Sequence, residues 1–274
     1  MPTFLAADNA SLHYDVHGDG PPLVVLAGGA ARHPSYVGDL AGLSGRLVVP
    51  HLRGVGLSPA PADPETGSYW RQAADVEALR EHLGLERLAL AAHSAGTRLA
   101  MAYAVQYPDR VARLLLITPP AGDLVDVPSD ADALIAARRH EPEVSAALAA
   151  REAGPDLADE ERFNDWQRAV APLCYAAWTV VEEEHARTAH YYLAAGLAYL
   201  SVDPPADLAE RLSAVRAPVL VLGGARDCVT GIAPVTALAG LFPSGDVVLL
   251  EQCGHYPWVE RPAEFRQAAE SWLA

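Results

Sequence analysis

Short apolar segments rich in valine and leucine alternate with longer amphipathic segments over most of the chain. A parallel sheet with helices on both faces requires this alternation, because its strands are buried on both sides. The apolar segments predict strands at residues 23–27, 46–50, 87–92, 111–118, 219–223 and 247–251, and the amphipathic segments predict helices at residues 69–83, 95–107 and 262–273. The pattern therefore predicts an α/β fold with a mostly parallel, doubly wound sheet.

The ends of these segments carry recognisable boundary signals. Pro108 ends the second helix, and Pro262 stands in the first turn of the last helix, where its missing N–H leaves no bond unmade. Residues 3–6 and 11–17 alternate between apolar and polar side chains, which predicts an antiparallel hairpin leading into the sheet.

The strand pattern disappears between residues 121 and 212, where the chain is rich in alanine and charged residues and reads as helical. We therefore expect residues 1–120 and 213–274 to form the core and residues 121–212 to be an inserted helical lid. Such a lid would cover the carboxyl ends of the strands, where clefts form in open α/β sheets. Prolines interrupt the segment at Pro142, Pro155, Pro172, Pro204 and Pro205.

Charge excludes several classes of partner. The net charge is −15 and the sequence pI is about 5.0, so phosphate backbones and anionic lipid headgroups would be repelled. We expect a small-molecule substrate and neither nucleic acid nor membrane as a partner. The amino terminus has no basic region followed by an apolar stretch, and no run approaches about 18 apolar residues, so a soluble, cytoplasmic protein is expected.

The cysteines indicate neither a disulfide framework nor a metal site. Cys174, Cys228 and Cys253 are odd in number and lack CxxC spacing. We expect free thiols, no metal and no cofactor.

The most specific chemical signal is the turn Ala92-His93-Ser94-Ala95-Gly96, between a predicted strand and a predicted helix. A serine exposed at so sharp a turn needs small residues two positions away on either side, because larger ones would collide with the strand and helix. The amino-terminal N–H groups of the helix point at the same place and would stabilise a developing anion. A plain strand-to-helix loop that contains a serine is the alternative, so the context of the turn matters.

That context consists of an acid and a base that follow Ser94 in the chain. Asp227 comes just after the strand predicted at 219–223, and His255 just after the strand at 247–251. A nucleophilic serine needs a base, and the base needs an orienting acid; in this architecture they follow in the order Ser, Asp, His. Each alone could be a turn residue or an ordinary loop histidine. Together they predict Ser94 as nucleophile, His255 as general base and Asp227 as its orienting acid.

With these residues in place, the chain resembles the α/β-hydrolase superfamily, and looks most like its proline-iminopeptidase-like and lidded esterase branches. The resemblance covers residues 20–120 and 215–274 and hardly extends to the lid. Residues 26–30, Leu-Ala-Gly-Gly-Ala, lie where the family carries a His-Gly-Gly-Pro-like loop, and residues 53–58 are similar to its Arg-Gly-x-Gly-x-Ser turn. The resemblance implies an oxyanion hole formed by the backbone N–H groups of Gly29 and Ala95.

Several positions depart from the peptidase branch. Ala27 replaces its usual histidine, Ala92 its glycine, Ala95 its tryptophan, and His51 and Leu52 its Asp-Gln pair. None of these changes removes a catalytic side chain, but the substrate does not follow from the resemblance.

Other residues are weaker candidates. Arg53 is expected to tether the loop around Gly54 rather than bind a ligand, and the acidic run 182–184 is read as a solvated helix face, although it would suit a substrate's amino group. His93 is expected to pack on the turn or to contact substrate. The proposed substrate contacts are Gly28, His93, Trp178 and Tyr256.

We therefore expect a serine hydrolase that cleaves a small or medium ester, lactone or amide through an acyl-enzyme on Ser94. One alternative is a proline-iminopeptidase-like aminopeptidase, favoured if an acid of residues 182–184 points into the pocket. The other is a non-hydrolytic lyase or ligand-binding protein on the same fold, because fold does not fix function.

Overall fold

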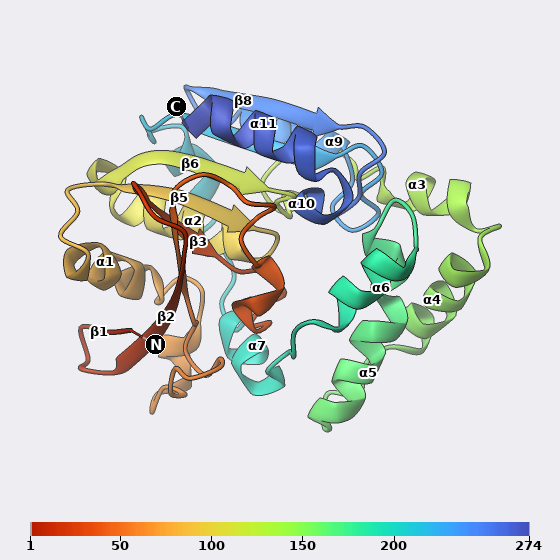
Figure 1. The fold of residues 1–274 in the computed structure, drawn as a ribbon, viewed down its shortest axis with the longest axis horizontal. Coiled ribbons are helices and arrows are strands. Elements are labelled where there is room, and N and C mark those ends of the chain that lie inside the picture. The colour runs from red at the N-terminus through yellow and green to blue at the C-terminus, as the bar shows by residue number, and fades with distance from the viewer. Residues whose placement is uncertain (1, 274) are drawn as a thin grey trace.

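The computed structural model describes residues 2–273, and its centre is one eight-stranded sheet (Figure 1). The strands lie in the order β1-β2-β4-β3-β5-β6-β7-β8. β1 pairs antiparallel with β2, and β2 with β4, whereas every pairing from β4 to β8 is parallel. The predicted α/β sheet with its amino-terminal hairpin is confirmed. The strands are Thr3–Leu5 (β1), Ser11–His17 (β2), Pro22–Leu26 (β3), Arg46–Pro50 (β4), Leu88–His93 (β5), Val111–Ile117 (β6), Val219–Gly224 (β7) and Gly245–Leu250 (β8).

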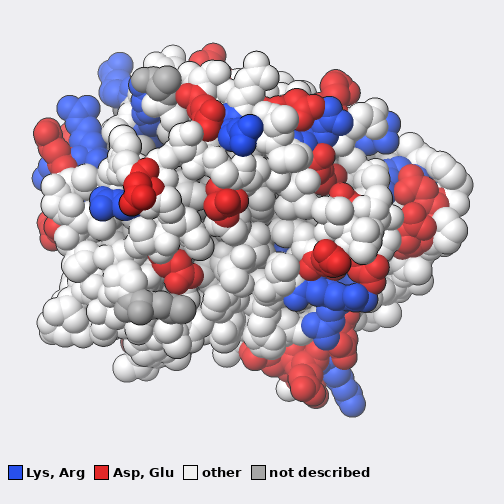
Figure 2. Space-filling view, in the orientation of Figure 1, with Lys and Arg blue, Asp and Glu red and all other residues white. Residues whose placement is uncertain are grey.

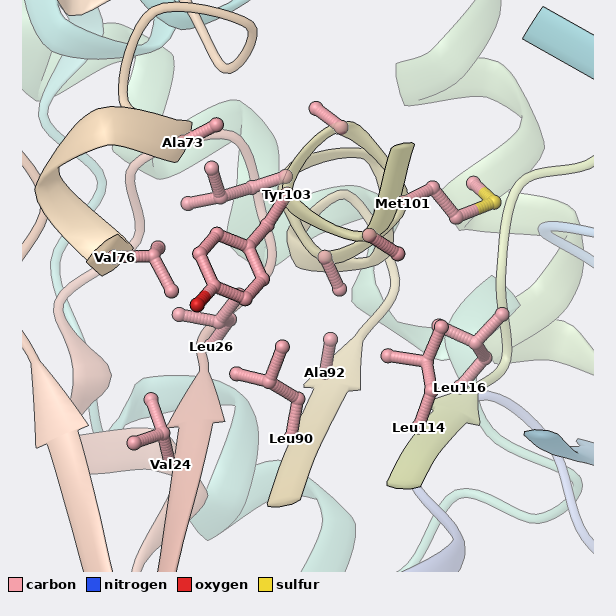
Figure 3. Close-up of a cluster of buried hydrophobic side chains, with 14 of the residues drawn as sticks. Val24, Leu26, Ala73, Val76, Leu90, Ala92, Met101, Tyr103, Leu114 and Leu116 are labelled. Atoms are coloured by element: carbon pink, nitrogen blue, oxygen red, sulfur yellow. The ribbon is translucent and has the colours of Figure 1, made fainter. Parts of the chain in front are cut away.

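Helices cover both faces of this sheet. Because successive strand residues point to opposite faces, Val24 and Leu26 of β3 enter one buried cluster and Leu23 and Val25 enter the other. Figure 3 shows the first cluster, where Leu90 and other side chains of β3, β5 and β6 meet those of α1 and α2. The second cluster packs under α10 and α11. The helices of the sheet region are Ala73–His82 (α1), Gly96–Gln106 (α2), Ala233–Ala239 (α9), Pro257–Glu260 (α10) and Pro262–Leu273 (α11).

Residues 121–212, called here the cap segment, join β6 to β7 and are helical. Figure 1 shows α4, α5 and α6 beyond the end of the sheet toward which the arrowheads of β6 and β8 point. The last two helices of the segment differ from the others, because Tyr199, Leu208 and Leu212 belong to the same buried cluster as α2. The helices of the segment are Ala131–Arg138 (α3), Pro142–Ala153 (α4), Glu160–Val170 (α5), Val180–Arg187 (α6), Leu193–Tyr199 (α7) and Leu208–Leu212 (α8).

Some boundaries differ from the sequence-based expectation. The helix predicted at residues 69–83 begins only at Ala73 in the structure. The residues before it contact the cap segment, where the backbone N–H of Tyr69 donates to the carbonyl of Tyr199 (3.0 Å). β8 begins at Gly245, two residues early, and α9 was not predicted because it is short and apolar.

Two surface properties complete the description. On the face of residues 2–273 shown in Figure 2, acidic and basic side chains are interspersed, without a continuous basic patch. None of the described helices is both long and apolar enough to cross a membrane.

Candidate active site

Ser94 occupies the sharp turn between β5 and α2. Its φ of +50° lies in the left-handed region, which is costly for a residue with a side chain and clusters at functional sites. The backbone N–H of Ser94 donates to the carbonyl of Ile117 on the neighbouring strand (2.8 Å), which fixes the turn. A Cβ on Gly96 would lie 2.5 Å from the Leu26 carbonyl oxygen, so only glycine fits there. Ala92, which stands where the peptidase branch has glycine, is fully buried, and the structure accommodates its methyl group.

Asp227 and His255 form a buried pair at the ends of β7 and β8. Asp227 Oδ2 lies 2.8 Å from His255 Nδ1, and the two residues are 1% and 3% exposed. The Thr230 hydroxyl donates to Oδ2 (2.6 Å), and the backbone N–H of Val229 donates to Oδ1 (2.8 Å). Burial raises the pKa of Asp227, but the neighbouring His255 and these hydrogen bonds outweigh it and lower the pKa below its usual value. Asp227 is thus held as a carboxylate that fixes the orientation of the imidazole through Nδ1, and Nε2 takes no part in this pair.

The backbone of His255 is fixed against the strand ends beside Ser94. Its carbonyl oxygen accepts hydrogen bonds from His93 Nε2 (3.0 Å) and from the Thr118 hydroxyl (3.1 Å). Its N–H donates to the carbonyl of Cys174 in the cap segment (2.7 Å). The loop that carries the proposed base is therefore held by the residue next to Ser94.

His93 belongs to a chain of hydrogen bonds that begins in the loop after β3. The Gly28 N–H donates to the Tyr36 hydroxyl (2.6 Å), and that hydroxyl lies 2.8 Å from His93 Nδ1. Because Nε2 must donate to the His255 carbonyl, the assigned tautomer has Nδ1 accepting from Tyr36. Burial lowers the pKa of His93 well below its usual value and keeps the ring neutral. Both ring nitrogens are engaged within the protein, which favours packing on the turn over substrate contact.

The loop after β3, residues 27–36, brings backbone donors to Ser94. We call it the β3 loop. A Cβ on Gly28 would lie 3.0 Å from Ser94 Cβ, so the two segments touch. The Gly28 N–H is used by Tyr36, whereas in the described part of the chain the backbone N–H groups of Gly29 and Ala95 donate to no other residue. Gly29 has a φ of +68°. Gly29 and Ala95 thus keep unused backbone donors in the segments that flank Ser94.

The β3 loop is also joined to the cap segment. Arg32 forms an isolated antiparallel bridge with Tyr191. A Cβ on Gly196 would lie 2.5 Å from the Ala30 carbonyl oxygen, so α7 packs closely on this loop. We call this contact between residues 30–33 and residues 190–196 the seam. Two main-chain hydrogen bonds flank the bridge, from His33 N–H to the His190 carbonyl (2.7 Å) and from Tyr192 N–H to the Ala31 carbonyl (3.2 Å).

Comparison with known proteins assigns the family. A family model described as alpha/beta hydrolase fold matches residues 21–262. The chain belongs to the α/β-hydrolase family. It is 25% identical to AB hydrolase superfamily protein YclE of Bacillus subtilis (strain 168), over 97% of this chain and 96% of that protein. It is 27% identical to a proline iminopeptidase of Lactobacillus helveticus (strain DPC 4571), over 92% and 90% of the two proteins.

A solved structure shows the same fold. The enol-lactonase of Burkholderia xenovorans LB400 superposes with a TM-score of 0.73 at 23% identity, covering 99% of each chain. Family membership and these hydrolase relatives make the chain an α/β-hydrolase enzyme.

In this α/β hydrolase the two aromatic candidates for substrate contact lie in an aromatic cluster. Tyr256 is buried, and its hydroxyl accepts a hydrogen bond from Arg32 Nη1 (3.1 Å). Its ring stacks on Tyr175 at a centroid distance of 4.9 Å, and Trp178 is the next ring outward, 5.5 Å from Tyr175. Tyr256 thus adjoins the site, while Trp178 is separated from it by Tyr175.

The acidic run of the cap segment of this hydrolase has local partners. Glu182 is buried and completes a capping box with Thr179 at the start of α6. Glu183 pairs with Arg187 one turn along the helix, and Glu184 is exposed. Two of the three acids are thus engaged within α6, and Glu184 has no ion-pair partner among residues 2–273.

Arg53 is a tether, as the sequence analysis anticipated. Its guanidinium forms ion pairs with Asp75 (2.6 Å) and Asp8 (2.7 Å). No pattern in the sequence marks Arg32, Tyr36 or Thr118 as part of the site. Arg32 and Tyr36 follow the glycines of the β3 loop, but no spacing signal marks them, because their partners lie far away in the sequence.

Proposed function

We propose that the chain is a serine hydrolase that cleaves a small or medium ester or lactone through an acyl-enzyme on Ser94. The observation that carries the proposal is the combination of the strained turn at Ser94 with the buried pair of Asp227 and His255. A serine hydroxyl is a weak nucleophile at neutral pH and needs a base that is held in one tautomer. Asp227 supplies that constraint, because its Oδ2 accepts from His255 Nδ1.

The reaction has two halves. In the first, His255 Nε2 removes the proton from Ser94 Oγ as this oxygen bonds to the substrate carbonyl carbon; the carbonyl electron pair moves to oxygen, and the N–H groups of Gly29 and Ala95 stabilise the anion. The bond to the alcohol then breaks, and the imidazolium gives its proton to the leaving oxygen. In the second, water attacks the acyl-enzyme with His255 again as base, releasing the acid and restoring Ser94.

We assign residues 121–212 as the cap that selects the substrate, on the core formed by residues 1–120 and 213–274. All three proposed catalytic residues lie outside the cap, and its contacts with the β3 loop support a position beside the proposed oxyanion donors. Gly28 and Tyr256 remain the proposed surroundings of the substrate, and Trp178, which lies behind Tyr175, would contact only a longer substrate. For His93 we propose positioning of the base loop through its bond to the His255 carbonyl (3.0 Å).

Labelling with a fluorophosphonate probe tests the nucleophile. The wild-type protein should be labelled at Ser94, identified by peptide mass spectrometry, and should hydrolyse p-nitrophenyl esters. Ser94→Ala should fold, resist labelling and lower kcat by on the order of 10⁴ or more. Ser44→Ala is the matched control, because Ser44 is a surface residue bonded to Glu270 (2.7 Å). Labelling elsewhere, or activity of the Ser94 variant within tenfold of wild type, would refute the proposal.

An aminopeptidase is the second candidate, favoured by the similarity to a proline iminopeptidase over 92% of the chain. The capping role of Glu182 and the ion pair of Glu183 speak against it, because a substrate amine needs a free acid. Comparing kcat/KM for prolyl-naphthylamide and for p-nitrophenyl esters separates the two. A higher value for the amide would replace the esterase assignment.

A further inference from the structure

Arg32 is a buried cation without an anionic partner. Its side chain is 2% exposed, and in residues 2–273 no carboxylate oxygen lies within 4.0 Å of its guanidinium. Its Nε has no hydrogen-bond partner in the described chain. Isolated buried charges are costly and are normally paired. The other buried arginines follow that rule: Arg53 pairs with Asp75 and Asp8, Arg80 with Glu77, and Arg138 with Glu141.

The groups around Arg32 are electron-rich but neutral. Nη2 donates to the carbonyls of His185 (3.2 Å) and Ala186 (3.3 Å) in the last turn of α6. The guanidinium carbon lies 4.4, 5.2 and 5.8 Å from the ring centroids of Tyr36, Tyr191 and Tyr256. Burial raises the pKa of each of these phenols, so they stay protonated at neutral pH. Carbonyl dipoles and aromatic faces hold the guanidinium in place without cancelling its charge.

The unpartnered nitrogen lies beside the proposed oxyanion donor. A Cβ on Gly29 would lie 2.7 Å from Arg32 Cβ, 3.5 Å from Arg32 Cδ and 2.8 Å from Tyr191 Cε1. The side chain of Arg32 therefore runs across Gly29, and Nε is the atom bonded to that Cδ. Gly29 itself is partly exposed, as are Ser94 and Tyr191. A positive charge with a buried, unpaired Nε–H thus lies against Gly29, the proposed oxyanion donor next to Ser94.

We propose that Arg32 binds a carboxylate on the substrate, and that the enzyme prefers esters or lactones that carry a carboxylate a few atoms from the scissile carbonyl. The inference rests on the proposed function of Ser94. It narrows the substrate class from esters in general to anionic ones. The net charge of the protein is −15, so its overall electrostatic potential does not attract an anionic substrate. A buried local cation is the feature that would select such a substrate.

A purely structural role predicts something different. Arg32 joins the β3 loop to α6, so its removal could loosen the seam and slow every substrate equally. The decisive quantity is therefore a ratio: kcat/KM for monophenyl succinate or glutarate, divided by kcat/KM for a phenyl ester of the same length that ends in a methyl group. Loss of a charge-assisted hydrogen bond should lower that ratio roughly 10- to 150-fold in Arg32→Met.

Two variants calibrate the measurement. Arg138→Met removes a buried arginine of the cap segment that has its own carboxylate in Glu141 and also donates to the Tyr175 carbonyl; it should leave the ratio at its wild-type value. Arg32→Lys keeps the charge without the planar fork and should restore part of the ratio.

The outcomes separate the inference from the proposed function. If Ser94 is not labelled and neither ester is cleaved, the proposed function fails. If Ser94 is labelled and the neutral ester is cleaved, but wild type shows no preference for the anionic ester, or Arg32→Met slows both equally, Arg32 is only a tether and the inference is overturned. Should Arg32→Met not fold, competitive inhibition of wild type by glutarate but not by pentanamide supports the inference, and equal inhibition or none overturns it.

Discussion

Two buried ionic groups lie near Ser94, and they are satisfied to opposite degrees. The carboxylate of Asp227 has His255, Thr230 and Val229 as partners, all within its own end of the sheet. Arg32 on the β3 loop has carbonyls and aromatic rings but no anion among residues 2–273. The first group is complete before substrate arrives, as preorganised catalysis requires. The second is incomplete by one negative charge, which is what a recognition site for an anion requires.

The largest effect expected from this comparison is at Asp227. Asp227→Asn should lower kcat by on the order of 10³ to 10⁴, because the amide can donate to His255 Nδ1 and favour the wrong tautomer. Unlike the change at Arg32, the loss should be the same for anionic and neutral esters. Steady-state kinetics on both phenyl esters check this, with Asp246→Asn on the exposed face of β8 as a control. A loss confined to one ester class would show that Asp227 and Arg32 do not act separately, the first on the reaction and the second on substrate recognition.

A smaller effect is expected where the two regions meet, at Tyr36. Tyr36→Phe leaves the Gly28 N–H without an acceptor and His93 Nδ1 without a donor, both buried. The free energy of unfolding should fall by about 1–3 kcal/mol, measured by urea denaturation. Tyr14→Phe is the matched control, because among residues 2–273 the Tyr14 hydroxyl has only the exposed His82 as partner (3.2 Å). An equal loss of unfolding free energy in both variants would mean that the hydrogen-bond chain through His93 contributes no more to stability than the single bond of Tyr14.

The smallest effect concerns pH and Glu260, whose carboxylate accepts the backbone N–H groups of Ala176, Gly254 and Tyr256. Burial raises the pKa of Glu260 from 4.5 to about 7. Because the folded pKa is above the unfolded one, the folded state holds the proton longer. The contribution of Glu260 to stability is therefore fully present below pH 4.5 and is lost as the pH rises through about 7.

Glu260→Gln should remove this dependence. Between pH 4.5 and 7.5, the unfolding free energy of wild type should fall relative to that of the variant by on the order of 1 kcal/mol. Glu264→Gln, at a partly exposed position on α11, is the control. Parallel pH profiles for wild type and Glu260→Gln would contradict the assigned pKa.

The sequence predicted those parts of the molecule that depend on local pattern or on chain order. The strands follow from apolar runs, and Ser94, Asp227 and His255 follow from their places after successive strands. Arg32 and Tyr36 could not be found in this way, because their partners Tyr256 and His93 are 224 and 57 residues away along the chain. The acidic run at residues 182–184 shows the converse: a charge pattern that suited a ligand is explained by a helix cap at Glu182. Periodicity reports which side of an element is buried, and does not report which buried polar group lacks a partner.

The seam between the β3 loop and the cap segment restricts how this enzyme can be recombined with its relatives. The bridge between Arg32 and Tyr191 and the flanking bond from His33 to His190 cross from core to cap. A cap transplanted from another family member would place a different backbone segment against these main-chain hydrogen bonds. The mismatch would shift the backbone of Gly29. Chimeras should therefore exchange residues 27–36 together with the cap segment, so that the swapped module carries its own β3 loop. The exchangeable unit of this enzyme is discontinuous in sequence and continuous in space.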